Sequence, residues 1–389
     1  MQRRSFAAAA LALGASLPGL ARAQAEPFKI GLILPMTGPF ASTGRQIDAA
    51  VKLYLSEHGD KAGGRKIEVL LRDDAGRPDQ TRQIAQEMIV NDKVAVIAGF
   101  GITPSALAVG PVATQARVPA VIMAAATSNI VSKSPFFVRT SYTLPQTATT
   151  MADWAAKNKL KKIVTLVSDY GPGLDAEKSF RDRLLLDGGQ VMGQLRVPMA
   201  NPDFAPYLQK VRDLAPDAVF VFIPSGPAVA LMKQFTERGL DQAGIKLIGD
   251  GGVTDDDTLN EMGNTAVGVV TAFHYSAAHP SATNRKFVAA FMAANKGMRP
   301  NFMAVGGYDG MRVICTALEA THGKGTGEAL VAAMKGQLFE SPRGPVLIDA
   351  QTRDIVQDIY VRRVERRDGQ LWNVEFDVNK GVKDSVKAD

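Results

Sequence analysis

The chain has 389 residues, of which 46% are hydrophobic, and a formal net charge of +6 from 45 basic and 39 acidic residues. Three basic residues, Arg3, Arg4 and Arg22, belong to a segment that we expect to be removed, which leaves about +3 and argues against nucleic-acid binding. The remaining chain of about 365 residues exceeds one comfortable hydrophobic core, so length and composition predict two domains.

The N-terminus has the three parts of a secretory signal peptide. Arg3 and Arg4 supply positive charge, Phe6–Leu20 is mostly apolar, and residues 21–23 form a small-x-small cleavage site. We therefore expect residues 1–23 to be cleaved on export, although cleavage two residues further on fits nearly as well. The arginine pair also half-matches a twin-arginine signal, but an ordinary positive n-region favours the Sec route.

Beyond residue 28, short β-branched runs alternate with longer amphipathic runs, the pattern of parallel sheets covered by helices. A first set of strands is expected at Lys29–Leu34, Ile67–Arg72, Val94–Gly99 and Pro119–Met123, with helices near Gln46–Glu57, Gln80–Val90 and Ser105–Gln115. A second set is expected at Lys162–Val167, Val191–Val197, Ala218–Ile223 and Lys246–Ile248, with helices near Glu177–Leu186, Phe204–Leu214 and Pro227–Arg238. The sequence thus predicts two α/β lobes, each with a doubly wound parallel sheet.

The remaining segments connect and cover these lobes. They are a crossing at Phe137–Ser141, a helix near Gln146–Lys157, a returning strand at Gly268–Ser276, helices near Asn284–Asn295, Gly307–Thr321 and Gly327–Lys335, and a terminal hairpin at Gln357–Asp377. Because the last three helices have no strands between them, we expect them to cover the first sheet. We assign residues 27–142 and 277–346 to lobe 1, and residues 143–276 and 347–389 to lobe 2. Two or three crossings predict a hinge.

One segment invites a cofactor interpretation. Gly171–Ala176 fits the dinucleotide fingerprint G-x-G-x-x-A between a predicted strand and a predicted helix. Pro172 has no N–H to offer a phosphate, and no acidic residue ends the following strand to hold a ribose. A turn that needs flexible backbone is the favoured interpretation. An exported NAD-type enzyme stays as the alternative from another class, and titration with NADH distinguishes the two.

No other enzyme or metal motif is assembled in the sequence. The four histidines lack metal-ligand spacing, and the sole cysteine, Cys315, lies in an apolar helical run that predicts a buried side chain. Asp255–Asp257 is interpreted as the acidic first turn of a helix rather than as a metal site. We therefore predict no catalytic residue, no metal and no cofactor, although an unmarked catalytic triad remains open.

Short motifs follow many of the predicted strands. The first is Gly31–Phe40, with Gly44 closing its loop. The others are Asp73-Asp74 with Pro78, Ala124–Thr127, Val138–Thr140, Asp169–Gly173, Asp217–Val219, and Phe302 with Gly307–Asp309. In this order, and over essentially the entire mature chain, they resemble the periplasmic leucine/isoleucine/valine-binding protein family.

The resemblance implies the type I periplasmic binding protein fold, in which two α/β lobes joined by three hinge crossings close on a ligand. It also implies delivery of that ligand to the permease of an ATP-driven (ABC) importer. Ligands of open α/β sheets sit beyond the carboxyl ends of the strands, where these motifs lie. We accordingly expect a monomeric, non-enzymatic protein of the periplasm with no nucleic-acid partner.

Residue by residue, the resemblance implies a ligand site, to which we add Phe40 and Asp250. The full set is Phe40, Thr43, Ile102, Thr103, Ala125, Ala126, Thr127, Tyr170, Asp250, Gly251 and Phe302. The Ala125–Thr127 backbone and the Thr127 hydroxyl are expected to bind a carboxylate, Tyr170 to reach over from the second lobe, and Phe302 to form an apolar wall. A helix N-cap at Ala125–Thr127 and plain core packing of Phe302 are the alternatives.

The departures from the family concern the ligand's charges. Ile102 with Thr103 stands where amino-acid binders have a serine, and Gly251 stands where they have a glutamate for the α-ammonium group. A buried ammonium without an anionic partner costs several kcal/mol, so the ligand is expected to lack one. Asp250 could substitute, but in an extended strand its side chain points opposite to that of its neighbour.

The apolar side of the expected cleft is enlarged, because Thr43 replaces a bulky aromatic residue of the family. Aromatic residues are also abundant near the cleft and hinge, namely Phe40, Tyr170, Phe222, His274, Tyr275 and Phe302. These features predict an aromatic or hydrophobic carboxylate, such as a benzoate or a phenylpropenoate. A branched-chain amino acid or a small amide is the nearest alternative. Whether His274 and Tyr275 line the cleft or only the hinge stays open.

Overall fold

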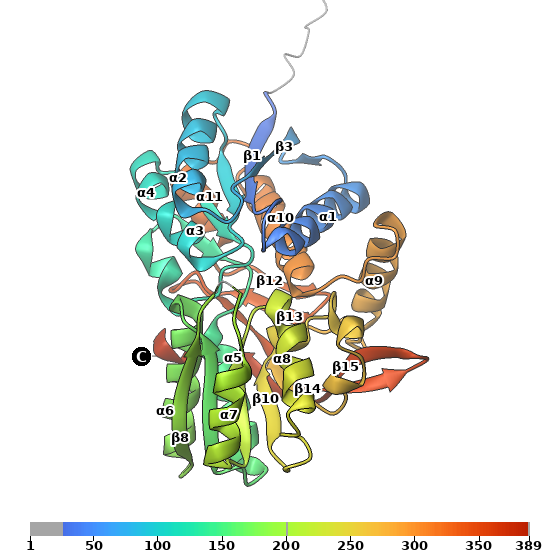
Figure 1. Cartoon of the computed structure of the whole chain (residues 1–389). Helices are drawn as coiled ribbons and strands as arrows, with labels where there is room; N and C mark the ends of the chain where they lie inside the picture. The colour runs from blue at the N-terminus through green and yellow to red at the C-terminus, as the bar shows by residue number, and fades with distance from the viewer. Residues whose placement is uncertain (1–25, 200, 388–389) are drawn as a thin grey trace, which may run out of the picture.

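The computed structural model describes residues 26–199 and 201–387, so the expected signal segment lies outside the described residues. The chain forms two sheets with helices packed around them, one unit in the upper half of Figure 1 and one in the lower half. This two-sheet α/β architecture confirms the predicted fold class. No helix in the described part of the chain is long and apolar enough to span a membrane.

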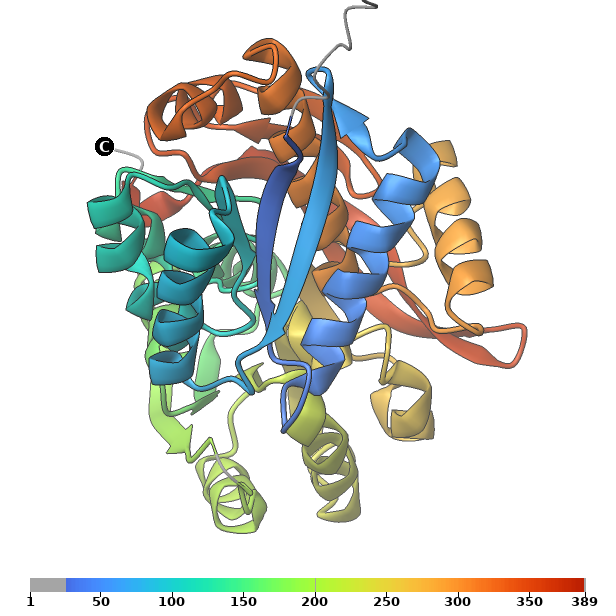
Figure 2. The ribbon, with the colours of Figure 1, turned by 90° about the horizontal axis from the view of Figure 1, so that it is seen from above.

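The first sheet has the strand order β2-β3-β1-β4-β5-β6 and is parallel except for the short β2–β3 hairpin. Its strands are β1 (Phe28–Leu34), β2 (Lys61–Ala62), β3 (Arg65–Asp73), β4 (Val96–Gly99), β5 (Ala120–Ile122) and β6 (Phe137–Arg139). The central strands β1, β4 and β5 are almost entirely buried, as expected for parallel strands covered on both faces. Figure 2 shows helices on both sides of β1 and β3.

Six helices accompany this sheet: α1 (Ala41–His58), α2 (Pro78–Glu87), α3 (Thr103–Ala108), α4 (Gly110–Ala116), α10 (Phe302–Ala320) and α11 (Gly327–Met334). A π-helical turn, η1 (Met88–Asp92), extends α2. The single helix expected over residues 105–115 is two helices, because Pro111 stands in the first turn of α4 and cannot continue α3. Ile314 and Cys315 on α10 and Leu330 on α11 belong to the core of the first sheet, which confirms the prediction for two of the three late helices. The prediction is wrong for the third helix, residues 282–294, because its buried Phe287 and Phe291 join the core that contains the strands of the second sheet.

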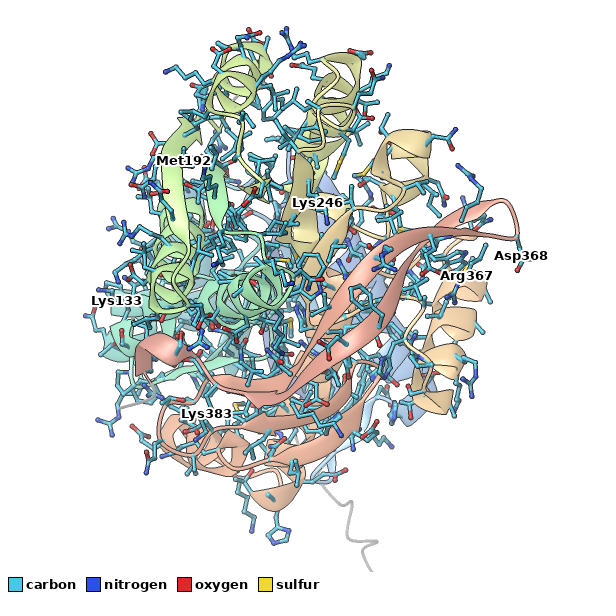
Figure 3. All side chains as sticks on the ribbon, turned by 90° about the horizontal axis from the view of Figure 1, so that it is seen from below. Lys133, Met192, Lys246, Arg367, Asp368 and Lys383 are labelled. Carbon is cyan, nitrogen blue, oxygen red and sulfur yellow. The ribbon has the colours of Figure 1, made fainter. Side chains whose placement is uncertain are left out.

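The second sheet is parallel through β8-β7-β9-β10-β11 and then antiparallel through β14, with β13, β12 and β15 beyond it. Its strands are β7 (Lys162–Ser168), β8 (Gln190–Val197), β9 (Ala218–Phe222), β10 (Lys246–Asp250), β11 (Val270–Phe273), β12 (Leu338–Ser341), β13 (Gly344–Ile348), β14 (Ile355–Arg367) and β15 (Gln370–Val382). The terminal hairpin expected from the sequence is β14–β15, and Arg367 and Asp368 lie at its tip (Figure 3).

The helices around the second sheet are α5 (Leu144–Lys157), α6 (Gly171–Leu186), α7 (Ala205–Leu214), α8 (Ser225–Glu237) and α9 (Ala282–Ala294). Short 3-10 helices occur at η2 (Ser128–Lys133), η3 (Gly251–Thr254), η4 (Leu259–Ala266) and η5 (Ser385–Lys387). The β12–β13 hairpin was not expected. It pairs with β14 of the second sheet, whereas its side chains Phe339 and Val346 join the core of the first sheet. The lobe boundaries assigned from the sequence stay a prediction.

A buried arginine ties the connections between the two sheets together. Arg343, in the β12–β13 turn, forms an ion pair with Asp309 of α10 at 2.6 Å, and both side chains are inaccessible to solvent. The same guanidinium donates to the carbonyls of Thr140 (2.7 Å) and Ser141 (3.0 Å) and to the Gln357 side chain (2.9 Å). Removing either partner of such a pair would leave an uncompensated buried charge, so this cluster fixes the connecting segments firmly.

Candidate functional site

A cavity of about 700 Å³ opens where loops from the two sheets meet. Its walls come from the ends of strands in both sheets and from the loops that follow them. The lining residues are Pro39, Phe40, Ser42 and Thr43 after β1, Gly101–Thr103 after β4, Ala124–Ala126 after β5, Tyr170 and Pro172 after β7, Met199, Asn201, Pro202 and Phe204 after β8, Phe222–Pro227 and Ala230 at and after the end of β9, Asp250, Gly252, Asp255 and Thr258 at and after the end of β10, Asn301–Met303 at the start of α10, and Tyr142 before α5. These strand ends are where open α/β sheets bind ligands. The size is typical of a small-molecule site.

Most of the site residues expected from the sequence meet here. The cavity is lined by Phe40, Thr43, Ile102, Thr103, Ala125, Ala126, Tyr170, Asp250 and Phe302. Thr127 and Gly251 do not line it. Phe302 is both wall and core, because its ring also packs edge-on against Phe273 at 4.7 Å.

Gly251 has a structural reason rather than a ligand-binding one. A Cβ atom at this position would collide with the ring of Phe273 and the guanidinium of Arg362, on the side away from the cavity. The Gly251 carbonyl accepts a hydrogen bond from Arg362 at 3.0 Å. Positions 250 and 251 face opposite ways, as expected, but it is the Asp250 side chain that faces the cavity. An acidic side chain introduced at position 251 would therefore not reach the ligand.

Asp250, at the end of β10, presents a buried carboxylate to the cavity. It accepts hydrogen bonds from the Thr147 hydroxyl at 2.7 Å and the Gly252 N–H at 2.9 Å. Tyr142 is a further hydroxyl partner. Burial raises the pKa of Asp250 to about 6, against the lowering effect of these donors and of Arg362.

Asp255 is a second buried carboxylate in the cavity lining. The Ser225 hydroxyl donates to it at 2.6 Å and the Asn301 amide at 3.1 Å. Burial raises its pKa to about 7, and the neighbouring acids Asp257 and Asp256 raise it as well. The interpretation of Asp255–Asp257 as a helix N-terminus is wrong, because these residues form a turn between η3 and η4 that side chains from elsewhere hold.

The opposite wall, formed by the loops after β4 and β5, offers donors. Thr103 lines the cavity, and its hydroxyl lies 2.9 Å from that of Thr127, which stands behind it. Because each hydroxyl has one proton, the pair can keep one proton free for a ligand. Thr127 stands at the N-cap position of η2, but its side chain makes no capping hydrogen bond there.

The backbone of the same wall adds a further donor and a distant positive charge. The Ala126 N–H has no hydrogen-bond acceptor within the described part of the chain. The fully buried Arg139 donates to the carbonyls of Thr127 (2.8 Å) and Ala125 (3.4 Å) and forms an ion pair with Asp354 at 2.8 Å. Among the described residues, no lysine or arginine lines the cavity itself.

Aromatic rings close the cavity. Tyr170 lies 6.2 Å from Phe222 between ring centroids, and Tyr142 stacks on His274 at 4.7 Å. His274 and Tyr275 are fully buried behind this wall and do not line the cavity. Burial lowers the pKa of His274, whose ring nitrogens have no partner within the described structure. His274 therefore supports the wall from behind, through its contacts with Tyr142 and Phe302.

Several lining residues escaped the sequence analysis, above all Tyr142, Ser225, Asp255 and Asn301. Tyr142 lies in a segment assigned to the hinge, and Asp255 in a run assigned to a helix start. The one available signal was Asn301, which directly precedes Phe302 and caps α10 by accepting from Met303 N–H at 2.9 Å.

The segment Gly171–Ala176 forms the first turns of α6, with Pro172 near its start. A Cβ at Gly173 would collide with the Ser168 carbonyl, so this glycine permits close packing of helix and strand. The Asp175 carboxylate accepts from the Ser128 N–H at 2.8 Å and places a negative charge in the first turns of the helix. No group of three or more potential metal ligands occurs within the described residues.

The comparison with known proteins agrees with this architecture. The model of a family described as periplasmic binding protein matches residues 27–370. The chain belongs to the periplasmic binding protein family. A curated relative, the Leu/Ile/Val-binding protein homolog 6 of Brucella melitensis biotype 1, is 44% identical over 358 residues, covering 91% of this chain and 92% of the relative.

Two solved structures of this family are especially similar. One is a solute-binding protein of an ABC transporter from Rhodopseudomonas palustris BisB5 in complex with 3,4-dihydroxybenzoic acid, with 59% identity, a TM-score of 0.91, and coverage of 93% of this chain and 99% of that one. Another, a solute-binding protein from R. palustris in complex with 4-hydroxybenzoate, has 38% identity, a TM-score of 0.90 and the same coverage. This periplasmic binding protein is a solute-binding protein and not an enzyme.

Proposed function

We propose that this protein is the solute-binding component of an ABC importer and that it binds an aromatic carboxylate carrying a ring hydroxyl group. The ligand occupies the cavity between the two sheets and is delivered to a membrane permease from the periplasm. The N-terminal segment directs export and is then cleaved, and the exported protein acts as a monomer. Similarity to the R. palustris proteins that bind hydroxylated benzoates supports the ligand class.

The observation that carries the proposal is the opposite hydrogen-bonding character of the two polar walls. The Thr103 hydroxyl and the free Ala126 N–H donate, as a carboxylate requires. Asp250 and Asp255 accept, as a phenol requires. Between them the rings of Phe302, Tyr142 and Tyr170 suit a flat apolar body. A hydroxybenzoate has these three parts in this order.

The donor wall needs no cation in contact with the ligand. A carboxylate that accepts several neutral donors is well stabilised in a buried site. Arg139, which is paired with Asp354, holds this wall in place by donating to the carbonyls of Ala125 and Thr127. The Thr127 hydroxyl then acts by orienting Thr103 rather than by touching the ligand.

A branched-chain amino acid is the second candidate, and Asp250 is the observation that favours it. This carboxylate lines the cavity and could pair with an α-ammonium group. The aromatic walls favour the hydroxylated ring instead, whereas the carboxylate acceptors alone do not distinguish a phenol from an ammonium group, since both donate. The two candidates differ in whether the group that meets Asp250 carries a charge.

Calorimetric titration of the mature protein tests the proposal. The ligands are benzoate, 4-hydroxybenzoate, 3,4-dihydroxybenzoate, leucine and phenylalanine. We expect the hydroxybenzoates to bind at least about 100-fold more tightly than either amino acid, a difference of roughly 2.7 kcal/mol. Incubation should leave each bound compound chemically unchanged. Tight binding of leucine without binding of any aromatic acid would contradict the proposal, as would conversion of a ligand by the pure protein.

A further inference from the structure

Two buried carboxylates face the cavity, although one acceptor would suffice for a single phenol. Asp250 is 1% exposed and Asp255 4% exposed, and both belong to the cavity lining. A carboxylate has about four lone-pair positions, and the chain's own donors fill only part of them on each residue. The remaining positions of both residues are available to donors from a ligand.

The two carboxylates lie at the same end of the cavity. The Ser225 hydroxyl lies 2.6 Å from the Asp255 carboxylate and 3.4 Å from the Gly252 carbonyl, and the Gly252 N–H donates to Asp250 at 2.9 Å, so the two carboxylates are linked through neighbouring groups. Asp250 comes from the end of β10, and Asp255 follows five residues later, beyond η3. Two carboxylates at one end of the cavity can accept hydrogen bonds from two ligand hydroxyl groups on adjacent ring carbons.

We propose that Asp255 is a specificity-determining residue that accepts a hydrogen bond from a second ring hydroxyl, while Asp250 accepts from the first. The site thereby selects an aromatic acid with two neighbouring hydroxyl groups over the same acid with one. This inference rests on the proposed function, and it assigns the preference for a second ring hydroxyl group to the Asp255 side chain. Nothing covalent takes place, and no proton needs to be transferred.

The surroundings of Asp255 fix its direction. Ser225, at the start of α8, donates to the Asp255 Oδ2 atom, and Asn301 donates to the same atom. Asn301 is itself held by α1 and α10, because its N–H donates to the Gln46 side chain at 3.2 Å and its side chain caps α10. Elements of both sheets thus position this carboxylate, so it reaches its binding geometry only when the two parts are together.

The test compares the affinities of 4-hydroxybenzoate and 3,4-dihydroxybenzoate for wild-type protein and for Asp255→Asn. We expect the wild type to favour the dihydroxy acid by at least about tenfold, the size of one hydrogen bond to a charged acceptor. In Asp255→Asn this ratio should fall to near one, with less than about threefold change for 4-hydroxybenzoate. Asp213→Asn is the control for the loss of one carboxylate, because Asp213 is an exposed residue of α7 that does not line the cavity, and this variant should keep the wild-type ratio.

A second measurement uses the wild type alone and does not depend on how the variant folds. In 3-fluoro-4-hydroxybenzoate, a fluorine of similar size replaces the second hydroxyl and cannot donate. We expect it to bind no better than 4-hydroxybenzoate. Equal gains from fluorine and hydroxyl would overturn the assignment, as would an Asp255→Asn variant that keeps the tenfold preference. If no aromatic acid binds the wild type at all, the proposed function fails instead.

Discussion

The two polar walls of the cavity differ in the kind of group they present. The wall on the first sheet presents a hydroxyl and a backbone N–H, Thr103 and Ala126, and keeps its one arginine, Arg139, out of contact. The wall beyond β10 presents two carboxylates, Asp250 and Asp255, with raised pKa values. One wall therefore neutralises a ligand's charge by donors, and the other requires a neutral, proton-bearing group. This difference between the walls predicts the orientation of the ligand, with its charged group at the first wall and its hydroxyl group at the second.

The largest effect is expected from removing the donor hydroxyl of the first wall. Thr103→Val should weaken every aromatic carboxylate by roughly 2 to 3 kcal/mol, because a charged acceptor loses its partner and the site leaves it unpaired. Thr127→Val should cost less, since Thr127 only orients Thr103. Calorimetry with benzoate measures both variants. A larger loss for Thr127→Val than for Thr103→Val would reverse the assigned order.

Removing a carboxylate from the second wall should affect the unliganded protein. The folded-state pKa of Asp250 is raised to about 6 by burial, so its ionisation destabilises the fold as pH rises from about 4 to 7, and this cost is absent below pH 4. Asp250→Asn does not titrate. It should therefore gain stability relative to wild type, on the order of 2 kcal/mol, between pH 4 and pH 7. Thermal unfolding of the apo proteins at both pH values checks the sign.

The aromatic wall between the two poles is expected to have an intermediate effect. Tyr170→Ala should weaken 4-hydroxybenzoate by about 1 to 2 kcal/mol through lost apolar contact, and Tyr170→Phe by less, because the ring still closes the cavity. Equal losses in the two variants would show that the hydroxyl, not the ring, makes the contact. Fluorescence or calorimetric titration distinguishes these outcomes.

The smallest expected effect is a change of selectivity with pH. Asp250 faces Arg362, Tyr142 and Tyr170, and Asp255 faces other acids, so Asp250 and Asp255 are the cavity groups that protonate near pH 6 to 7. Above that range the ionised carboxylates accept better from the phenol of 4-hydroxybenzoate, whereas plain benzoate brings no donor to them. The preference for 4-hydroxybenzoate over benzoate should therefore increase several-fold from pH 5.5 to pH 8. A preference that falls with rising pH would contradict the role of the second wall.

Much of the scaffold could be predicted from the sequence. In sheets of parallel strands, the spacing of hydrophobic residues distinguishes buried strands from the amphipathic helices that cover them. Strands such as β1, β4 and β9 are continuous apolar runs, and their flanking helices are amphipathic. The β12–β13 hairpin escaped prediction because it is short, its turn holds Pro342, and β13 begins with Gly344 and Pro345. The side chains of this hairpin pack into the core of the first sheet, whereas its backbone pairs with β14 of the second sheet. Neither interaction is visible in the local sequence pattern.

The site was harder to predict because neighbouring residues in a strand face opposite ways. Residues predicted in the loops after β1, β4 and β5 line the cavity, but at the end of β10 the family pattern pointed to Gly251 whereas the cavity faces Asp250. Asp255 escaped because its partners, Ser225 and Asn301, are distant in the sequence. Tertiary hydrogen bonds, not local propensity, set the direction of these carboxylates.

The most direct test of the account is the orientation of 4-hydroxybenzoate in a crystal structure of the complex. The account predicts that the ligand carboxylate lies within hydrogen-bonding distance of the Thr103 hydroxyl and the Ala126 N–H, with the phenol oxygen on the Asp250 carboxylate. A ligand bound in the reverse orientation, with its carboxylate at Asp250 and its phenol at Thr103, would contradict the division of the cavity into a donor wall and an acceptor wall.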